Sequence, residues 1–255
     1  MVHRDKIIAA LDAILQPDTY RDACPNGMQV YGCDQVGKLA TCASVSVKFF
    51  EEARDAGAQL LLVHHGLFWE GASRVVDPLM ARRLKVLLDA ELNLAGYHLP
   101  IDAHHELGNN AQLAGLLGLR QLDFGFGHYK GMPIGCSGNL AEPVGLREFV
   151  DVAGKKLDSE TVVVDAGPTQ VGRVGVVSGG AGDIPLLMEA VAAGCDTFVT
   201  GVIFEQSVAV AREVGLNVVA LGHYNSEKLG VRAVGERIAK ELGVEVIHMD
   251  VPNPV

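Results

Sequence analysis

A repeated order of helix, glycine and apolar strand is the feature that most constrains how this 255-residue chain can fold. Residues 47–56 have one charged and one apolar side, a glycine follows at position 57, and residues 60–63 are the unalternated run LLLV. Such runs are typical of strands covered on both faces, as in parallel sheets. Residues 193–201 and 214–223 repeat this order. The repetition predicts an α/β fold of two related lobes with mixed, largely parallel sheets.

Helices and strands alternate along most of the remaining chain. We expect helices at 78–90, 109–117, 184–193, 205–214 and 226–242, and strands at 92–97, 195–201, 216–223 and 244–249. Asn109 or Asn110 can cap the second of these helices. The middle is richer in Gly and Pro, with one helix at 145–156 and short strands at 134–140, 161–165 and 171–177. We therefore predict α/β lobes from residues 1–119 and 180–255, and a middle lobe of about residues 120–179.

The charge balance and the cysteines limit the classes of function. A net charge of -10 weighs against a broad nucleic-acid or anionic-membrane surface, which needs clustered Lys and Arg. Five cysteines without C-x-x-C spacing favour reduced thiols in the cytoplasm. The first residues lack the apolar stretch of a signal peptide, and no apolar run approaches the length of a membrane span. A chain of this size folds without a structural metal, so a metal here would be functional.

Candidate ligands follow several predicted strands. His64 and His65 come directly after the buried run LLLV, and Asp102 and His223 lie at or just beyond two other strand ends. Ligands collect at the carboxyl ends of strands in open α/β sheets. We therefore expect these side chains to converge on one edge of a sheet.

The adjacent pair His64 and His65 permits two interpretations. Neighbouring residues of a strand point to opposite faces, so the pair serves one metal only if the strand has already turned. The alternation more easily gives each of two metals one imidazole. The alternative is one buried, hydrogen-bonded histidine and one exposed histidine.

His223 and Glu227 are four residues apart. They share a face if a helix begins at His223, which would suit a metal site. If Asn225 or Ser226 caps the helix, His223 ends the preceding strand, and Glu227 occupies a first turn that favours carboxylates without any metal.

The stretch from His98 to Asp102 links a strand end to a rigid turn that contains proline. Asp102 is either a ligand or an ordinary turn aspartate. His98 can orient Asp102, contact a substrate or bind metal, and we favour a supporting role. His104 and His105 are expected to be exposed loop residues.

A glycine-rich loop, SGGAGD at residues 178–183, follows one strand and precedes a helix. Its backbone N–H groups could face an anion, but the loop lacks both G-x-G-x-x-G and the P-loop lysine. The alternative is a tight turn in which Asp183 caps the following helix.

Several motifs together identify a family. They are PNGMQV at 25–30, VHHG at 63–66, GYHLPIDAH at 96–104, LGNNA at 107–111 and GHYNSE at 222–227. The chain resembles, over nearly its whole length, the dinuclear-metal family of GTP cyclohydrolase I type 2 homologues, also called Nif-three-like or YbgI-like proteins. One position departs from the pattern: Val202 follows Thr-Gly where relatives usually have Glu, which puts in doubt any role for an acid there.

The resemblance implies metal ligands and an assembly. The implied ligands are His64, His65, Asp102, His223 and Glu227. The resemblance also implies a toroidal homohexamer with its metal sites facing an internal cavity.

Two metals with five protein ligands keep open positions, which is typical of catalytic rather than structural sites. Histidine and carboxylate ligands suit zinc, iron, manganese or nickel. We expect metal-dependent hydrolysis by a metal-bridged water, with His98 positioning substrate or shuttling a proton. The family name suggests a nucleotide substrate such as GTP. The alternative is a non-enzymatic metal-binding hexameric ring that handles metal or encircles a partner such as DNA, although the acidic balance weighs against DNA.

Overall fold

The alternating helices and strands are distributed over two units of the chain. The computed structural model describes residues 1–253. The first unit comprises Met1–Ile101 and Val231–Pro252, and the second comprises Asp102–Gly230 with Asn253 at the end of the described chain. Residues 119 and 180, near which boundaries were expected, both lie inside the second unit. The helix at 109–117 contacts the strand at 132–145, and the strands at 170–176 and 197–200 pair with each other.

The first unit contains a five-stranded sheet with the order β13-β4-β5-β6-β2. Its strands are β2 (Gly27–Val30), β4 (Lys38–Ser44), β5 (Leu60–His65), β6 (Asn93–Gly96) and β13 (Glu245–His248). All neighbouring strands pair in parallel except β2 and β6, which are antiparallel. The expectation of parallel pairing, based on unalternated apolar runs, is confirmed for this sheet.

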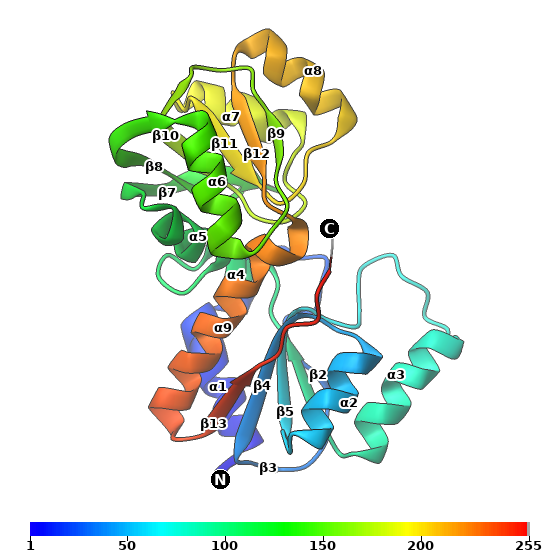
Figure 1. The fold of residues 1–255 in the computed structure, drawn as a ribbon. Helices are drawn as coiled ribbons and strands as arrows, with labels where there is room; N and C mark the ends of the chain where they lie inside the picture. Colours follow the sequence, from blue (N-terminus) through cyan, green and yellow to red (C-terminus); the bar gives the residue numbers. More distant parts are fainter. Residues whose placement is uncertain (254–255) are drawn as a thin grey trace. The chain divides into compact units, whose positions relative to one another are not determined.

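Helices cover both faces of this sheet: α1 (Arg4–Leu15) and the end of α9 (His223–Leu242) on one side, and α2 (Val47–Asp55) and α3 (Pro78–Asp89) on the other (Figure 1). Their first turns follow the sequence closely. Ser46 caps α2 by accepting from the Phe49 amide, and Asp77 caps α3 by accepting from the Met80 amide. A short 3-10 helix, η1 (Pro17–Thr19), and the strand pair β1 (Val2–His3) and β3 (Gln35–Val36) complete the unit.

The second unit contains a six-stranded sheet with the order β7-β8-β10-β11-β12-β9. Its strands are β7 (Arg120–Tyr129), β8 (Met132–Gly145), β9 (Val162–Val164), β10 (Gln170–Val176), β11 (Thr197–Thr200) and β12 (Asn217–Ala220). Pairing is parallel between β10, β11 and β12 and antiparallel elsewhere. The middle of the chain therefore extends the second sheet. The long strand β7 was not predicted, because its Gly-rich sequence reads as loop.

Five shorter helices belong to the second unit wholly or in part: α4 (Leu99–Ala103), α5 (Asn109–Leu117), α6 (Leu146–Leu157), α7 (Ile184–Ala192) and α8 (Glu205–Val214). The apolar sides of α5 and α6 pack against β8 and β10, with Phe149 and Leu113 in a core that includes Val174 and Val199. Figure 1 shows α7 and α8 on the other side of this sheet.

The fold class is confirmed as mixed α/β with mixed parallel and antiparallel sheets. The single sheet edge expected for the candidate ligands is wrong: His64 and His65 end a strand of the five-stranded sheet, whereas His223 follows a strand of the six-stranded sheet. Within residues 1–253, no helix is long and apolar enough to cross a membrane.

Candidate functional site

Three histidines of the first unit lie together where two parallel strands end. His64 and His65 are the last residues of β5, and His98 comes two residues after β6. The ladder between β5 and β6 ends at the pair Val63 and Gly96, so the three histidines lie beyond the last residues that these two strands pair. This is the carboxyl end of the strands, where open α/β sheets place their ligands.

The three rings form one cluster. One nitrogen of each of His64, His65 and His98 lies within 4.8 Å of the other two. The ring centroids are 4.5 Å apart for His64 and His65, 4.9 Å for His64 and His98, and 5.6 Å for His65 and His98. Trp69 stands edge-on to His98 at 5.0 Å and closes one side. The adjacent histidines therefore do not point apart as simple strand alternation suggested, because the ladder has already ended on the β6 side.

Each imidazole of this cluster has a hydrogen-bonding partner at Nδ1. The Nδ1 atom of His64 lies 3.2 Å from the carbonyl oxygen of Tyr97, and Nδ1 of His65 lies 2.9 Å from the hydroxyl of Ser44. The Nδ1 atom of His98 lies 2.8 Å from a carboxylate oxygen of Asp22. Metal-binding histidines commonly hold their second nitrogen in this way.

Asp22 is a site residue that the sequence did not reveal. Its carboxylate accepts hydrogen bonds from the amides of Cys24 and Leu99 and from the side chain of Asn26, in addition to His98. Burial alone would raise the pKa of Asp22, but these hydrogen bonds and the imidazole of His98 lower the pKa to about 2. Asp22 therefore remains a negatively charged acceptor at neutral pH.

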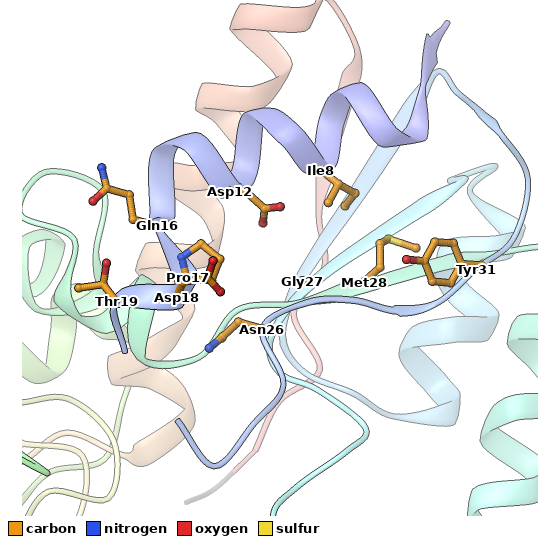
Figure 2. Close-up of a pocket in the computed structure, with 10 residues that line it drawn as sticks. All are labelled: Ile8, Asp12, Gln16, Pro17, Asp18, Thr19, Asn26, Gly27, Met28 and Tyr31. Atoms are coloured by element: carbon orange, nitrogen blue, oxygen red, sulfur yellow. The ribbon is translucent and has the colours of Figure 1, made fainter. Parts of the chain in front are cut away.

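A pocket of about 540 Å³ adjoins this network in the first unit. Figure 2 shows its lining, which includes Asp12, Asp18, Tyr31 and Asn26. The side-chain oxygen of Asn26 accepts from the backbone amide of His98 at 2.8 Å. One hydrogen-bonded residue thus connects the pocket wall to the histidine cluster.

The second unit holds Asp102, His223 and Glu227. Helix α9 begins at His223, so His223 and Glu227 share a face, and Nε2 of His223 lies 3.0 Å from Oε2 of Glu227. One oxygen of Asp102, on α4, lies within 4.8 Å of one oxygen of Glu227. The alternative that Asn225 or Ser226 caps the helix is therefore wrong, and so is the helix start expected at residue 226.

Two buried asparagines hold Asp102 in place. The side-chain amide of Asn109 donates to Asp102 at 2.8 Å and its oxygen accepts from the amide of Gly230. Asn110 donates to the carbonyl of Asp102 and accepts from the amide of Ser178. Neither side chain caps α5 as expected; the cap position is Gly108, which has no side chain to offer.

The glycine loop at 178–183 packs against the carboxylate of Glu227. Gly179 has a φ of +68°, and a Cβ there would overlap the Glu227 carboxylate. The amide of Gly179 donates to the hydroxyl of Ser226 at 3.0 Å, and Asp183 caps α7 as predicted. The loop thus makes room for a candidate ligand, a role the sequence left open.

The remaining predicted positions have structural roles. His104 is half-buried rather than exposed as expected, because it accepts from the amides of Glu106 and Leu107. The exposed His105 stacks on Phe124 with 4.1 Å between ring centroids. Val202 donates its amide to the carbonyl of Gly179 and so borders the glycine loop through its backbone.

The fold and these clusters define an α/β protein whose histidines and carboxylates are grouped as metal-binding residues are. Comparison with known proteins supplies the family. The model of the Duf34/NIF3 (NGG1p interacting factor 3) family matches residues 2–254, and the chain belongs to this family.

Relatives extend over nearly the full length. A protein of Haemophilus influenzae named GTP cyclohydrolase 1 type 2 homolog is 38% identical over 243 residues, covering 94% of each chain. A protein of the same name from Escherichia coli K12 is 39% identical over 234 residues, covering 91% of this chain and 92% of its own. Among solved structures, the protein ybgI, described as of unknown function, matches with a TM-score of 0.93 and 36% identity over the whole of both chains.

Proposed function

We propose that this protein binds two divalent metal ions through His64, His65, Asp102, His223 and Glu227 and acts as a metal-dependent hydrolase. The observation that carries the proposal is the close grouping of the candidate ligand atoms. Each candidate nitrogen or carboxylate belongs to a cluster whose ligand atoms lie within 4.8 Å of one another.

The donor set fits divalent ions of the zinc, iron, manganese and nickel group, which accept imidazole and carboxylate together. Cysteine thiolates do not contribute to these groups of candidate ligands, because the groups among residues 1–253 contain no cysteine. Burial also raises the pKa of Cys136 to about 12 and that of Cys195 to about 11, which keeps both thiols protonated at neutral pH. The space that Gly179 leaves for the Glu227 carboxylate supports the same assignment.

Bound divalent ions would supply Lewis acidity, which activates water and polarises a substrate oxygen. The chain's own contribution is positioning. The Tyr97 carbonyl fixes the ring of His64, Asn109 fixes the carboxylate of Asp102, and the glycine loop fixes that of Glu227. Held ligands need little reorganisation when an ion or a substrate arrives.

The substrate we propose is a small molecule of the nucleotide class. The relatives named GTP cyclohydrolase 1 type 2 homolog support it, and GTP is the first compound to test.

The test combines metal analysis with a turnover screen. Metal-free protein reloaded with Mn²⁺, Zn²⁺ or Fe²⁺ would be incubated with GTP, other nucleotides and model phosphoesters, and products followed by chromatography. Asp102→Asn and Glu227→Gln should each lower metal content and abolish turnover, whereas the exposed Glu142→Gln should change neither.

Two results would contradict the proposal. Full occupancy of both metals in Asp102→Asn and Glu227→Gln would remove the ligand assignment. Tight metal uptake without turnover of any compound would favour a metal-binding role without catalysis.

We also propose a homohexamer, which rests on the family resemblance. An exposed apolar stretch supports self-association: Val75, Val76 and Leu79 are 72%, 58% and 56% exposed. Light scattering should give six chains per particle, and Val76→Lys should reduce the mass.

A further inference from the structure

We propose that the pocket beside α1 in the first unit binds a small organic cation, which carries an ammonium or guanidinium group on an apolar body. The pocket has a volume of about 540 Å³, and its lining comes only from residues 8–31. This volume is typical of pockets that enclose small molecules. The occupant is not a metal ion, so the inference goes beyond the proposed function and does not rest on it.

The charge of the lining decides the sign of the ligand. Among the ten residues drawn in Figure 2, Asp12 and Asp18 carry carboxylates and none carries a positive charge. Two carboxylates on one cavity repel each other and would also repel a phosphate or a carboxylate ligand. A cation in the cavity removes this repulsion.

The two carboxylates of the pocket differ from others in the first unit because no side chain balances their charge. On α3, for example, the carboxylate of Asp89 lies 2.7 Å from the ammonium group of Lys85. Among residues 1–253, neither Asp12 nor Asp18 has a lysine, arginine or histidine partner. A positively charged ligand would supply the partner that the chain does not.

Asp12 is already fixed as an acceptor. Its Oδ1 atom accepts from the hydroxyl of Tyr97 at 2.6 Å, and Tyr97 is fully buried. Within the described part of the chain, no hydrogen bond reaches the Oδ2 atom of Asp12, and the residue is half-buried. Ionised donors make stronger hydrogen bonds to carboxylates than neutral donors do. We therefore assign Oδ2 of Asp12 as the acceptor for the cationic group.

One end of the pocket is suited to an apolar body. Figure 2 shows Ile8, Met28 and Tyr31 at this end and Asp18 at the other, with Asp12 between them. Aromatic rings and the thioether of methionine make favourable contacts with hydrocarbon and with other rings. The lining therefore fits an amine that carries a ring or a short hydrocarbon chain better than a bare inorganic cation.

Arg4 does not take the place of this ligand. Its guanidinium carbon lies 5.0 Å from the centroid of the Tyr31 ring, so this ring accepts a cation on one face. However, Arg4 pairs with Asp5 at 2.9 Å and with Asp34 at 3.2 Å, and it does not line the pocket. Its charge is balanced by carboxylates outside the pocket.

The test compares 2-phenylethylamine with 2-phenylethanol, which are similar in shape and differ in charge. Calorimetric titration of the full-length protein should give a dissociation constant of about 1 mM or lower for the amine, and binding at least about 10-fold weaker for the alcohol. Chelation of metal should leave the amine's affinity unchanged, because the lining contains no candidate metal ligand. The methyl NMR signals of Ile8 and Met28 should shift as the amine binds.

A second probe, Nα-acetyl-lysinamide, distinguishes a free amine from the lysine side chain of a protein partner. It carries the same ammonium group without a ring. We expect it to bind more weakly than 2-phenylethylamine, because it leaves the aromatic end of the pocket empty. Tighter binding of the lysine derivative would overturn a free amine as the occupant.

Variants of the lining identify the groups that bind. Asp12→Asn keeps an oxygen for Tyr97 but removes the charge, and should weaken the amine about 10–100-fold. Asp18→Asn, at an exposed position, should weaken it about 3-fold. Tyr31→Ser should weaken it about 3-fold as well. Asp89→Asn, on α3 and outside the pocket, is the matched control and should leave the affinity unchanged.

The proposal is overturned if the alcohol binds as tightly as the amine, if Asp12→Asn and Asp18→Asn both keep native affinity, or if the shifted NMR signals lie outside the pocket. Thermal unfolding checks that each variant folds. If Asp12→Asn does not, the exposed Asp18→Asn decides together with the two phenylethyl compounds. None of these readouts measures turnover, so failure of the proposed hydrolase activity leaves the result intact.

Discussion

The two units hold their candidate metal ligands in opposite ways. The first offers imidazoles, which are neutral when they bind metal, at the ends of strands, each held by a hydrogen bond at Nδ1. The second offers two carboxylates and one imidazole from helices α4 and α9, held by amides and by the space beside Gly179.

The two clusters differ in the free energy of repulsion among their side chains when no ion is bound. Neutral imidazoles can remain packed together, since no charge repels another. Asp102 and Glu227 are buried, with oxygens within 4.8 Å, and two carboxylates at that distance repel strongly where water is scarce. The second unit should therefore depend more on bound metal than the first.

Removing metal should have the largest effect and tests this comparison directly. An ion present at 1,000 times its dissociation constant stabilises by about 4 kcal/mol, which chelation would remove. Hydrogen exchange should rise most in residues 102–110, 178–183 and 223–230, and less in residues 60–66 and 96–99. Equal loss of protection in both sets of residues would show that charge repulsion does not distinguish the clusters.

Gly179→Ala should come next. Alanine at a φ of +68° costs about 1–2 kcal/mol, and its Cβ would displace the Glu227 carboxylate. We expect a loss of about 3 kcal/mol in stability and at least a 100-fold loss in metal affinity, measured by thermal unfolding and metal titration. Gly180→Ala is the control, because its Cβ would meet the nearest atom of His223 at an ordinary 3.5 Å. Equal effects of the two variants would rule out this role for Gly179.

The sequence predicted only some of the residues in these clusters. His64 and His65 were found because the apolar run before them marks a strand end locally. Asp22 was missed because it lies 76 residues from His98, and nothing near it in sequence marks that contact.

Two misreadings have the same origin. Either Asn109 or Asn110 was expected to cap a helix, since asparagine favours that position, but both side chains make tertiary hydrogen bonds instead. The pattern of helices and strands also does not state which strands share a sheet, so ligands of two sheets were assigned to one edge.

Asn109→Ala should have an intermediate effect on the second cluster. The change removes a donor from the buried Asp102 and an acceptor from the amide of Gly230. Such losses cost about 1–3 kcal/mol, and metal affinity should fall about 10–100-fold. Gln112→Ala on the same helix, where the side chain is only half-buried, should change stability by less than about 0.5 kcal/mol. An Asn109→Ala variant with native metal affinity would show that Asp102 does not need this support.

The smallest expected effect is a difference between the two units in the pH at which each loses stability. In the first unit, the Nδ1 atom of His248 on β13 lies 2.7 Å from the hydroxyl of Thr41 on β4. Burial lowers the pKa of His248 below 6.5, with Arg232 acting in the same direction and Glu236 opposing it. The unfolded chain therefore binds this proton more readily, and the stability of β13 should decline as pH falls below about 6.5 toward the folded pKa.

In the second unit, Glu189 on α7 accepts from the amides of Gly127 and His128 and from the His128 ring. Burial opposes ionisation of Glu189, but these donors outweigh it and lower its pKa below 4.5. The stabilisation that ionised Glu189 gives to the folded state is complete above pH 4.5 and is lost as pH falls through the folded pKa of Glu189. Each effect should be about 1 kcal/mol or less because both groups are partly exposed.

Hydrogen exchange at stepped pH should therefore show β13 loosening as pH falls below about 6.5, and the contact of β7 with α7 loosening only below about pH 4.5. His248→Gln should remove the first change and Glu189→Gln the second. If both regions lost protection at one pH, the two units would be responding to a shared titration. The separate hydrogen bonds at His248 and Glu189 would then not determine the pH at which either region loosens.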